Sequence, residues 1–157
     1  MDFNPEFVDM VVMIKSTTEL LRTSLEEKAI NIHLNLPTNL ILYVDKRMIE
    51  VVFRNLISNA IKFTPKQGTI SVDTTEKENL YLFSVTDNGV GIKEAHIDKL
   101  FRIDSTYSSL GTNNERGTGL GLILCKDFID YHKGKIWVES KHNVGSKFYV
   151  SIPKSYH

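Results

Sequence analysis

One stretch of this sequence decides its fold: Phe53-Arg-Asn-Leu-Ile-Ser-Asn-Ala-Ile-Lys-Phe63. At 100° per residue, a helix over about residues 46–63 carries two adjacent stripes of side chains. The apolar stripe predicts a face buried in the core, and it comprises Ile49, Val52, Leu56, Ala60 and Phe63. The second stripe lies a quarter-turn away and comprises Met48, Val51, Asn55, Asn59 and Lys62. The helix is expected to end before Pro65, because a residue that precedes proline avoids helical dihedral angles.

The two asparagines of the second stripe call for an explanation, because asparagine is a poor helix former. Asn55 and Asn59 lie one turn apart, and Lys62 follows on the same side of the helix. Amide oxygens suit a hard cation such as Mg²⁺, and an ammonium group suits phosphate. Two solvated amides beside a solvated lysine would give the same pattern, so the stripe alone leaves both interpretations open.

The composition indicates a single globular domain. The chain has 157 residues, of which 41% are hydrophobic, and 19 Lys and Arg balance 19 Asp and Glu. Zero net charge supplies no general field for nucleic acid, and no apolar run reaches the roughly 20 residues that span a bilayer. Cys125 is the one cysteine, so an internal disulfide is excluded and a core position is expected for this thiol.

The rest of the chain alternates between helical and strand patterns. Besides the helix over 46–63, helices are expected over about 9–28, 94–100 and 120–132. Strands are expected over about 30–36, 69–75, 80–87, 135–140 and 146–152. This order predicts an α+β fold: a two-layer α/β sandwich with about three helices on one face of a mixed, largely antiparallel sheet of about five strands. His132 falls at a helix C-terminus, where a cationic ring is mildly favoured.

The segment Asp87-Asn-Gly-Val-Gly91 follows a strand of alternating apolar residues. Asn-Gly is a favoured hairpin turn, which is one interpretation of this segment. The residues after Gly91 show no returning strand pattern, however, and two glycines let a ligand approach the backbone closely. A carboxylate at the end of a buried strand can accept a hydrogen bond from an exocyclic amine, so Asp87 is a candidate ligand-binding residue.

The segment Gly117-Thr-Gly-Leu-Gly-Leu122 stands where a long polar stretch meets the last long helix. Backbone amides at a glycine-rich helix entry bind anions well, although a hinge without a ligand would have the same composition. A dinucleotide fingerprint requires glycine at the sixth place, which is Leu122 here, and the P-loop sequence is absent from the chain. Both of these nucleotide-binding motifs are therefore excluded.

Taken in this order, the segments resemble the ATP-binding catalytic domain of sensor histidine kinases, in the superfamily that also includes gyrase, Hsp90 and mismatch-repair ATPases. Asn55–Thr64 is similar to the N box of the family, Asp87–Gly91 to its G1 box, and Gly117–Leu122 to its G2 box. Leu100-Phe101-Arg102 is similar to the F box, and residues 134–140 and 145–148 resemble its closing strands. The resemblance covers almost the whole chain and implies the Bergerat-type ATP-binding fold, which agrees with the sandwich predicted above.

The resemblance implies a role for each matching residue. Asp87 would accept a hydrogen bond from the adenine amino group, and Asn59, aided by Asn55, would ligate Mg²⁺. Lys62 would neutralise phosphate charge and Arg102 would approach the γ-phosphate, so the implied catalytic set is Asn55, Asn59, Lys62 and Arg102. The implied ATP contacts are Asn59, Lys62, Phe63, Asp87, Gly89, Gly91, Ile92, Phe101, Arg102, Arg116, Gly117, Thr118, Gly119, Leu120, Gly121 and Leu122. Residues from about 103 to 116 would form the ATP lid.

The implied function is transfer of the ATP γ-phosphoryl group to a histidine on a dimerisation domain that this chain lacks. Residues 1–157 would form one catalytic domain of a longer protein, with residues 1–8 as the linker from that dimerisation domain. None of the histidines has the setting of the family's phosphoacceptor, so autophosphorylation of the isolated chain is not expected. A monomer is expected, because the family dimerises through the absent domain. A response regulator would be an indirect partner. The expected compartment is the cytoplasm, either for a soluble protein or for the cytoplasmic part of a membrane-anchored sensor.

Two alternatives share these boxes: a regulatory serine kinase of the same fold, and a catalytically silent nucleotide-binding interaction module. Relatives that hydrolyse ATP carry a glutamate one helical turn before the first asparagine, where this chain has Val51. Glu50 is turned nearly opposite to Asn59 around the helix and cannot easily reach a water at the γ-phosphate. Slow hydrolysis is therefore expected.

Overall fold

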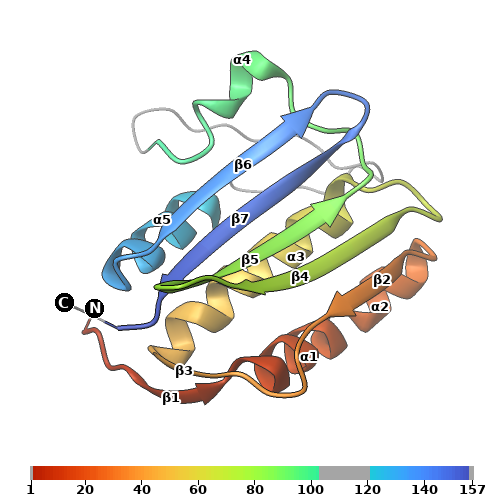
Figure 1. Ribbon diagram of the computed structural model, residues 1–157. Helices are drawn as coiled ribbons and strands as arrows, with labels where there is room; N and C mark the ends of the chain where they lie inside the picture. Colours follow the sequence, from red (N-terminus) through yellow and green to blue (C-terminus); the bar gives the residue numbers. More distant parts are fainter. Residues whose placement is uncertain (1, 103–120, 156–157) are drawn as a thin grey trace.

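A computed structural model of the chain describes residues 2–102 and 121–155 (Figure 1). The decisive helix is α3, Lys46–Phe63, with the bounds that the sequence predicts. Asp45 caps its first turn by accepting a hydrogen bond from the Met48 amide (3.1 Å), and Thr64 leaves the helical region just before Pro65.

The main sheet has five strands in the order β2-β4-β5-β7-β6. β2 pairs with β4 in parallel, and the other neighbours are antiparallel, which confirms the mixed, largely antiparallel sheet. The strands are β2 Asn31–Asn35, β4 Thr69–Glu76, β5 Leu80–Asp87, β6 Lys135–Lys141 and β7 Gly145–Pro153.

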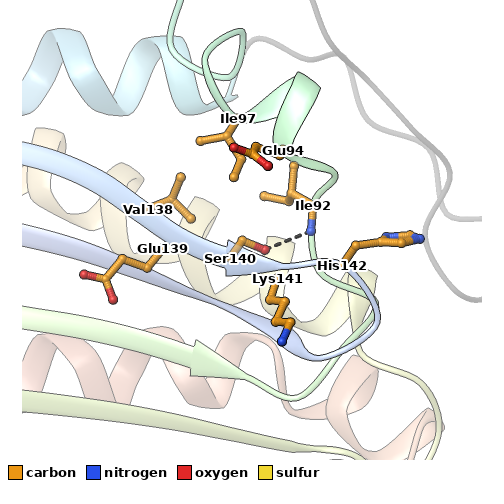
Figure 2. Close-up of a pocket in the computed structure, with 8 residues that line it drawn as sticks. All are labelled: Ile92, Glu94, Ile97, Val138, Glu139, Ser140, Lys141 and His142. Carbon is orange, nitrogen blue, oxygen red and sulfur yellow. Dashed lines mark hydrogen bonds between the residues drawn. The ribbon is translucent and has the colours of Figure 1, made fainter.

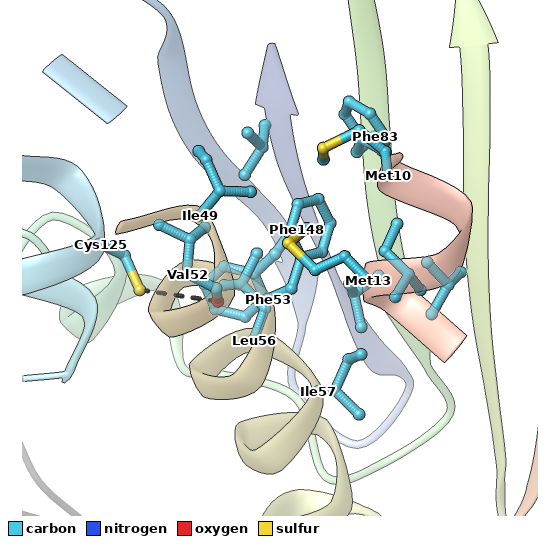
Figure 3. Packing of buried hydrophobic residues seen from close by; sticks show 14 of the residues in the cluster. Met10, Met13, Ile49, Val52, Phe53, Leu56, Ile57, Phe83, Cys125 and Phe148 are labelled. Atoms are coloured by element: carbon cyan, nitrogen blue, oxygen red, sulfur yellow. Dashed lines mark hydrogen bonds between the residues drawn. The ribbon is translucent and has the colours of Figure 1, made fainter. Parts of the chain in front are cut away.

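Three helices cover one face of this sheet, which confirms the two-layer sandwich (Figure 1). They are α1 Met10–Leu20, α3, and α5 Gly121–Tyr131, while the short helices are α2 Arg22–Glu27 and α4 Glu94–Ile97. In the core, the Phe53 ring of α3 packs edge-on against Phe83 of β5 with centroids 5.3 Å apart (Figure 3). Cys125 of α5 is fully buried with its Sγ 3.8 Å from the Val52 carbonyl oxygen, so its predicted core position is confirmed (Figure 3).

Two expectations about the first 45 residues were wrong or incomplete. The helix expected over 9–28 is broken at Leu21 into α1 and α2, because the Thr18 hydroxyl donates to the Ile14 carbonyl oxygen (2.9 Å), a bond that bends helices. A two-stranded ribbon was not predicted: β1 Glu6–Asp9 pairs with β3 Ile41–Val44. Within the described ranges, 2–102 and 121–155, no helix combines the length and the apolar character needed to cross a bilayer.

Candidate functional site

The C-terminal turn of α3 lies against the Asp87–Gly91 turn that follows β5. The Val90 amide donates a hydrogen bond to the Phe63 carbonyl oxygen (3.0 Å), although the two residues are far apart in the sequence. A Cβ atom on Gly89 would collide with the same carbonyl group, so only glycine allows this approach. The structure therefore brings two of the segments singled out in the sequence, residues 53–64 and 87–91, into direct contact.

Asp87 lies at the end of β5 with 7% of its surface exposed. Its carboxylate accepts a hydrogen bond from the Gly89 amide (2.9 Å), and the Ser146 amide is a second backbone donor to it. Burial raises the pKa of this carboxyl from 3.8 to about 6, against the smaller lowering by the two amides. At pH 7 the group is thus still mainly ionised and can accept a further hydrogen bond from a ligand amine.

Asn55 faces the first residue of α5. Its Nδ2 donates to the Val51 carbonyl oxygen (2.8 Å), so the other amide atom is the oxygen Oδ1, for which the described residues supply no donor. A Cβ atom on Gly121 would lie only 2.7 Å from this oxygen, so the amide and the start of α5 almost touch. Asn59 is half-buried one turn further along α3, and the described residues supply no hydrogen bond to its side chain. The amide oxygens of this stripe are the donor type that a hard cation such as Mg²⁺ takes.

Positive charge lies at the C-terminal turn of α3. Lys62 is half-buried, and its ammonium group is 4.9 Å from the centre of the Phe63 ring. Phe101 is half-buried, with its ring centroid 6.4 Å from that of Phe148 on β7, and Arg102 is exposed. Arg102 is the last described residue before position 121, and its approach to the γ-phosphate stays a prediction.

The exit of the 87–91 turn is held against β6. Gly91 has a φ of 68°, and the Ile92 amide then donates to the Ser140 hydroxyl oxygen (2.8 Å). A pocket of about 560 Å³ lies between α4 and β6. Figure 2 shows Ile92 among its lining side chains. The pocket is lined by Ile92, Glu94, Ile97, Val138, Glu139, Ser140, Lys141 and His142. Neither Asp87 nor Asn59 lines this pocket, whereas Ile92, one of the implied ATP contacts, does.

Several residues of the predicted site lie outside the described part of the chain. They are the lid over about 103–116 and the ATP contacts Arg116, Gly117, Thr118, Gly119 and Leu120. Leu122 is described and lies in the core with 9% exposure, so only its backbone could reach a ligand. Sequence reasoning missed two residues that bond to these segments: Ser140, which accepts from the Ile92 amide, and the buried Lys28, whose ammonium group donates to carbonyl oxygens at the end of α3. No sequence pattern would have found either, because each acts through contacts distant in the chain.

Comparison with known proteins agrees with this geometry. Residues 44–156 match the family described as "Histidine kinase-, DNA gyrase B-, and HSP90-like ATPase". The chain is 40% identical over 136 residues to cyanobacterial phytochrome A of Nostoc sp., covering 85% of the chain and 17% of the relative. It is 32% identical over 154 residues to the sensor histidine kinase WalK of Bacillus subtilis, covering 96% and 25% respectively. The chain thus spans a quarter or less of the length of these two relatives.

Solved structures give the same result. The catalytic domain of histidine kinase ThkA superposes with a TM-score of 0.84 at 29% identity, covering 99% of this chain and 100% of that one. A structure of histidine kinase ThkA in complex with response regulator protein TrrA matches with a TM-score of 0.78 at 25% identity, covering 98% and 42%.

Proposed function

This chain belongs to the family of histidine kinase-, DNA gyrase B- and HSP90-like ATPases, as a catalytic ATPase domain of the sensor histidine kinase type. We propose that it presents the γ-phosphoryl group of Mg·ATP to a histidine on another domain of its parent protein. The observation that carries the proposal is the hydrogen bond from Val90 to Phe63. It joins the helix with the cation-binding amides to the turn with the base-binding carboxylate.

Each residue of the site has a separate role in this proposal. Asp87 accepts a hydrogen bond from the adenine amino group, while guanine would place a carbonyl oxygen against the carboxylate. An unpaired polar group costs roughly 1–3 kcal/mol, so ATP is preferred to GTP. Asn59 and Asn55 hold Mg²⁺, and Lys62 and Arg102 bind phosphate oxygens. Phosphoryl transfer requires positioning and charge neutralisation more than covalent participation by the protein, and these residues supply both.

The amides fit a bound Mg²⁺ because Oδ1 of Asn55 is an acceptor without a donor among the described residues and faces the start of α5. When bound, the ion neutralises negative charge on the phosphates. Mg²⁺ usually keeps several waters and takes few protein ligands beside phosphates, so one or two amide oxygens suffice. A carboxylate to activate water is missing from the predicted position, which is occupied by Val51, so we propose transfer to an acceptor rather than rapid hydrolysis.

The partners follow from the same proposal. The chain would act on the histidine-bearing dimerisation domain of a longer protein, to which residues 1–8 would connect it, and indirectly on a response regulator. The complex of ThkA with TrrA supports this pairing for a kinase of this type. We expect the isolated domain to be a monomer without affinity for nucleic acid. A cytoplasmic location is part of the proposal, since the buried free thiol of Cys125 suits a reducing compartment.

The proposal is tested in two steps. Isothermal titration with ATP, ADP and GTP, each with and without Mg²⁺, should show Mg²⁺-dependent binding of ATP and much weaker binding of GTP. Labelled ATP is then mixed with the chain and a supplied dimerisation domain, and we expect an acid-labile phosphoprotein. An acid-stable product would instead indicate a serine kinase, and binding without transfer a silent module. Rapid steady-state hydrolysis by the isolated chain would contradict the kinase assignment.

A further inference from the structure

Lys28 is a buried lysine in the turn between α2 and β2, with 3% of its surface exposed. Its ammonium group donates hydrogen bonds to three backbone carbonyl oxygens at the end of α3: Ile61 (2.7 Å), Lys62 (3.1 Å) and Thr64 (3.1 Å). Because an ammonium group has three protons, this geometry can use all of them. A buried charge is costly unless it is fully hydrogen-bonded, so the position is specific to an ammonium group.

The last four carbonyl groups of any α-helix lack partners inside the helix. In α3 each of these four carbonyl groups accepts a hydrogen bond from a donor outside the regular helical pattern. The donors are the Thr64 hydroxyl for Ala60 (2.6 Å), Lys28 and, at 3.3 Å, the Thr64 amide for Ile61, Lys28 for Lys62, and the Val90 amide for Phe63 (3.0 Å). Lys28 therefore bonds to two adjacent carbonyl groups and is the donor to the Lys62 carbonyl among the described residues, and the next carbonyl group holds the turn that carries Asp87. A cation at this end also interacts favourably with the negative end of the helix dipole.

The backbone around Lys28 continues the same connection. The Gln67 amide donates to the Lys28 carbonyl oxygen (2.7 Å), and the Asn31 amide donates to Gly68 (3.0 Å). Asn88, next to Asp87, bonds to Thr69 through both its backbone amide (3.3 Å) and its side-chain oxygen (2.8 Å). Three turns distant in sequence, residues 28–31, 64–69 and 87–91, thus share one hydrogen-bonded layer beneath the end of α3.

We propose that Lys28 is a positioning residue for nucleotide binding. It touches no reacting atom; it holds the Ile61 and Lys62 carbonyls so that the Phe63 carbonyl meets Val90 and the Asp87 carboxylate keeps its place. This inference rests on the proposed nucleotide site, and it adds to that site a residue that lies outside the N, G1, F and G2 boxes.

The test replaces the ammonium group and measures the turn that it serves. Lys28→Met keeps the length of the side chain and removes the three donors. We expect at least tenfold weaker binding of both ATP and adenosine by calorimetry, and faster hydrogen exchange of the Val90 amide. The matched control is Leu25→Val, because Leu25 is buried in the neighbouring helix α2 and has an apolar side chain. This variant should lower the free energy of unfolding without changing adenosine affinity or Val90 exchange.

A chemical rescue separates positioning from general stability. Lys28→Cys is made in a Cys125→Ala background, so that the chain has one thiol, and is aminoethylated while unfolded and then refolded. The product carries an ammonium group at nearly the length of lysine. We expect adenosine affinity and Val90 protection to return, relative to the same variant without aminoethylation. If Lys28→Met does not fold, the comparison of Lys28→Cys with and without aminoethylation still tests the role of Lys28.

The outcomes are distinguishable. If the unaltered chain binds no ATP, the proposed function itself fails. If it binds ATP and Lys28→Met binds adenosine equally well with unchanged Val90 exchange, only the role of Lys28 is refuted. The role of Lys28 would also be refuted if Leu25→Val lost as much adenosine affinity and Val90 protection as Lys28→Met. It would be refuted as well if aminoethylation restored neither of the two.

Discussion

The substitution Asp87→Asn should change stability and nucleotide affinity in opposite directions. In the free protein the Asp87 carboxylate is buried, and its pKa is raised from 3.8 to about 6. At pH 7 this rise corresponds to about 3 kcal/mol of unfavourable free energy, since one pKa unit is about 1.4 kcal/mol. Asparagine removes the buried charge. Its single oxygen can accept from Gly89 or from Ser146, and the amide protons then oppose the other donor, which costs about 1–3 kcal/mol.

These two contributions predict a free energy of unfolding that is unchanged or raised by up to about 2 kcal/mol. Binding should respond differently, because the adenine amine would meet amide protons instead of a carboxylate. A hydrogen bond to a charged group contributes about 1.5–3 kcal/mol, so adenosine affinity should fall by about 10- to 150-fold.

The assay combines urea unfolding at pH 7 with calorimetric titration of adenosine, which has no phosphates and so reports on the base-binding residues alone. The matched control is Asp45→Asn, because Asp45 is a second buried carboxylate that accepts two backbone hydrogen bonds, from Met48 (3.1 Å) and Asn4 (2.9 Å). It caps the opposite end of α3, so this variant should lose stability and keep adenosine affinity. Unchanged adenosine affinity in Asp87→Asn, or an equal loss in Asp45→Asn, would refute the role given to Asp87.

Three further predictions concern other parts of the fold. Burial lowers the pKa of His132 below 6.5, so the unfolded state takes up the proton first as the pH falls. The free energy of unfolding should therefore decrease below about pH 6.5, by at most about 1.4 kcal/mol per pH unit. In urea unfolding, the difference in this free energy between wild type and His132→Gln should shrink from pH 7 to pH 5. Gly89→Ala should cost about 1–3 kcal/mol in urea unfolding and weaken adenosine binding, because the new Cβ would displace Phe63 from the turn; unchanged affinity would contradict this contact. Burial raises the pKa of Cys125 to about 12, so iodoacetamide at pH 8 should label the unfolded chain and leave the native one unlabelled, as intact-mass spectrometry can show.

The sequence was sufficient for the elements whose residues repeat with a clear period. Helix α3 has the predicted bounds because its apolar stripe, its cap at Asp45 and the stop at Pro65 all agree. Strand β5 has the predicted bounds as well, since Phe83, Val85 and Asp87 alternate towards the core. The contact between the helix and the 87–91 turn was expected only from the resemblance, because nothing local in either segment specifies the other.

Features made by contacts between distant residues were beyond the reach of the sequence. The mild preference for a cationic ring at His132 is opposed by the structure. The ring is fully buried, Nδ1 lies 2.7 Å from the Phe128 carbonyl oxygen, and Nε2 accepts from the Asp45 amide (3.0 Å). Burial opposes the charged form, which a helix terminus alone would favour. Lys28 was overlooked for the same reason, because a single lysine after a short helix looks like a surface residue until its carbonyl partners are known.

Helix α3 is fixed at both ends by residues from elsewhere in the chain, and this explains how a site of dispersed residues can keep its geometry. At its start, Asp45 bonds to His132 at the end of α5 and to Asn4 near the N-terminus. At its end, Lys28 and Val90 bond to its carbonyl groups. The side chains between these ends sit on a rigid helix, where the spacing of Asn55, Asn59 and Lys62 follows from the helical repeat. Changes at the C-terminal end should therefore act on nucleotide binding by moving the helix relative to the turn of Asp87. Changes at the start of the helix should act mainly on stability, and changes within the stripe on the metal and the phosphates alone.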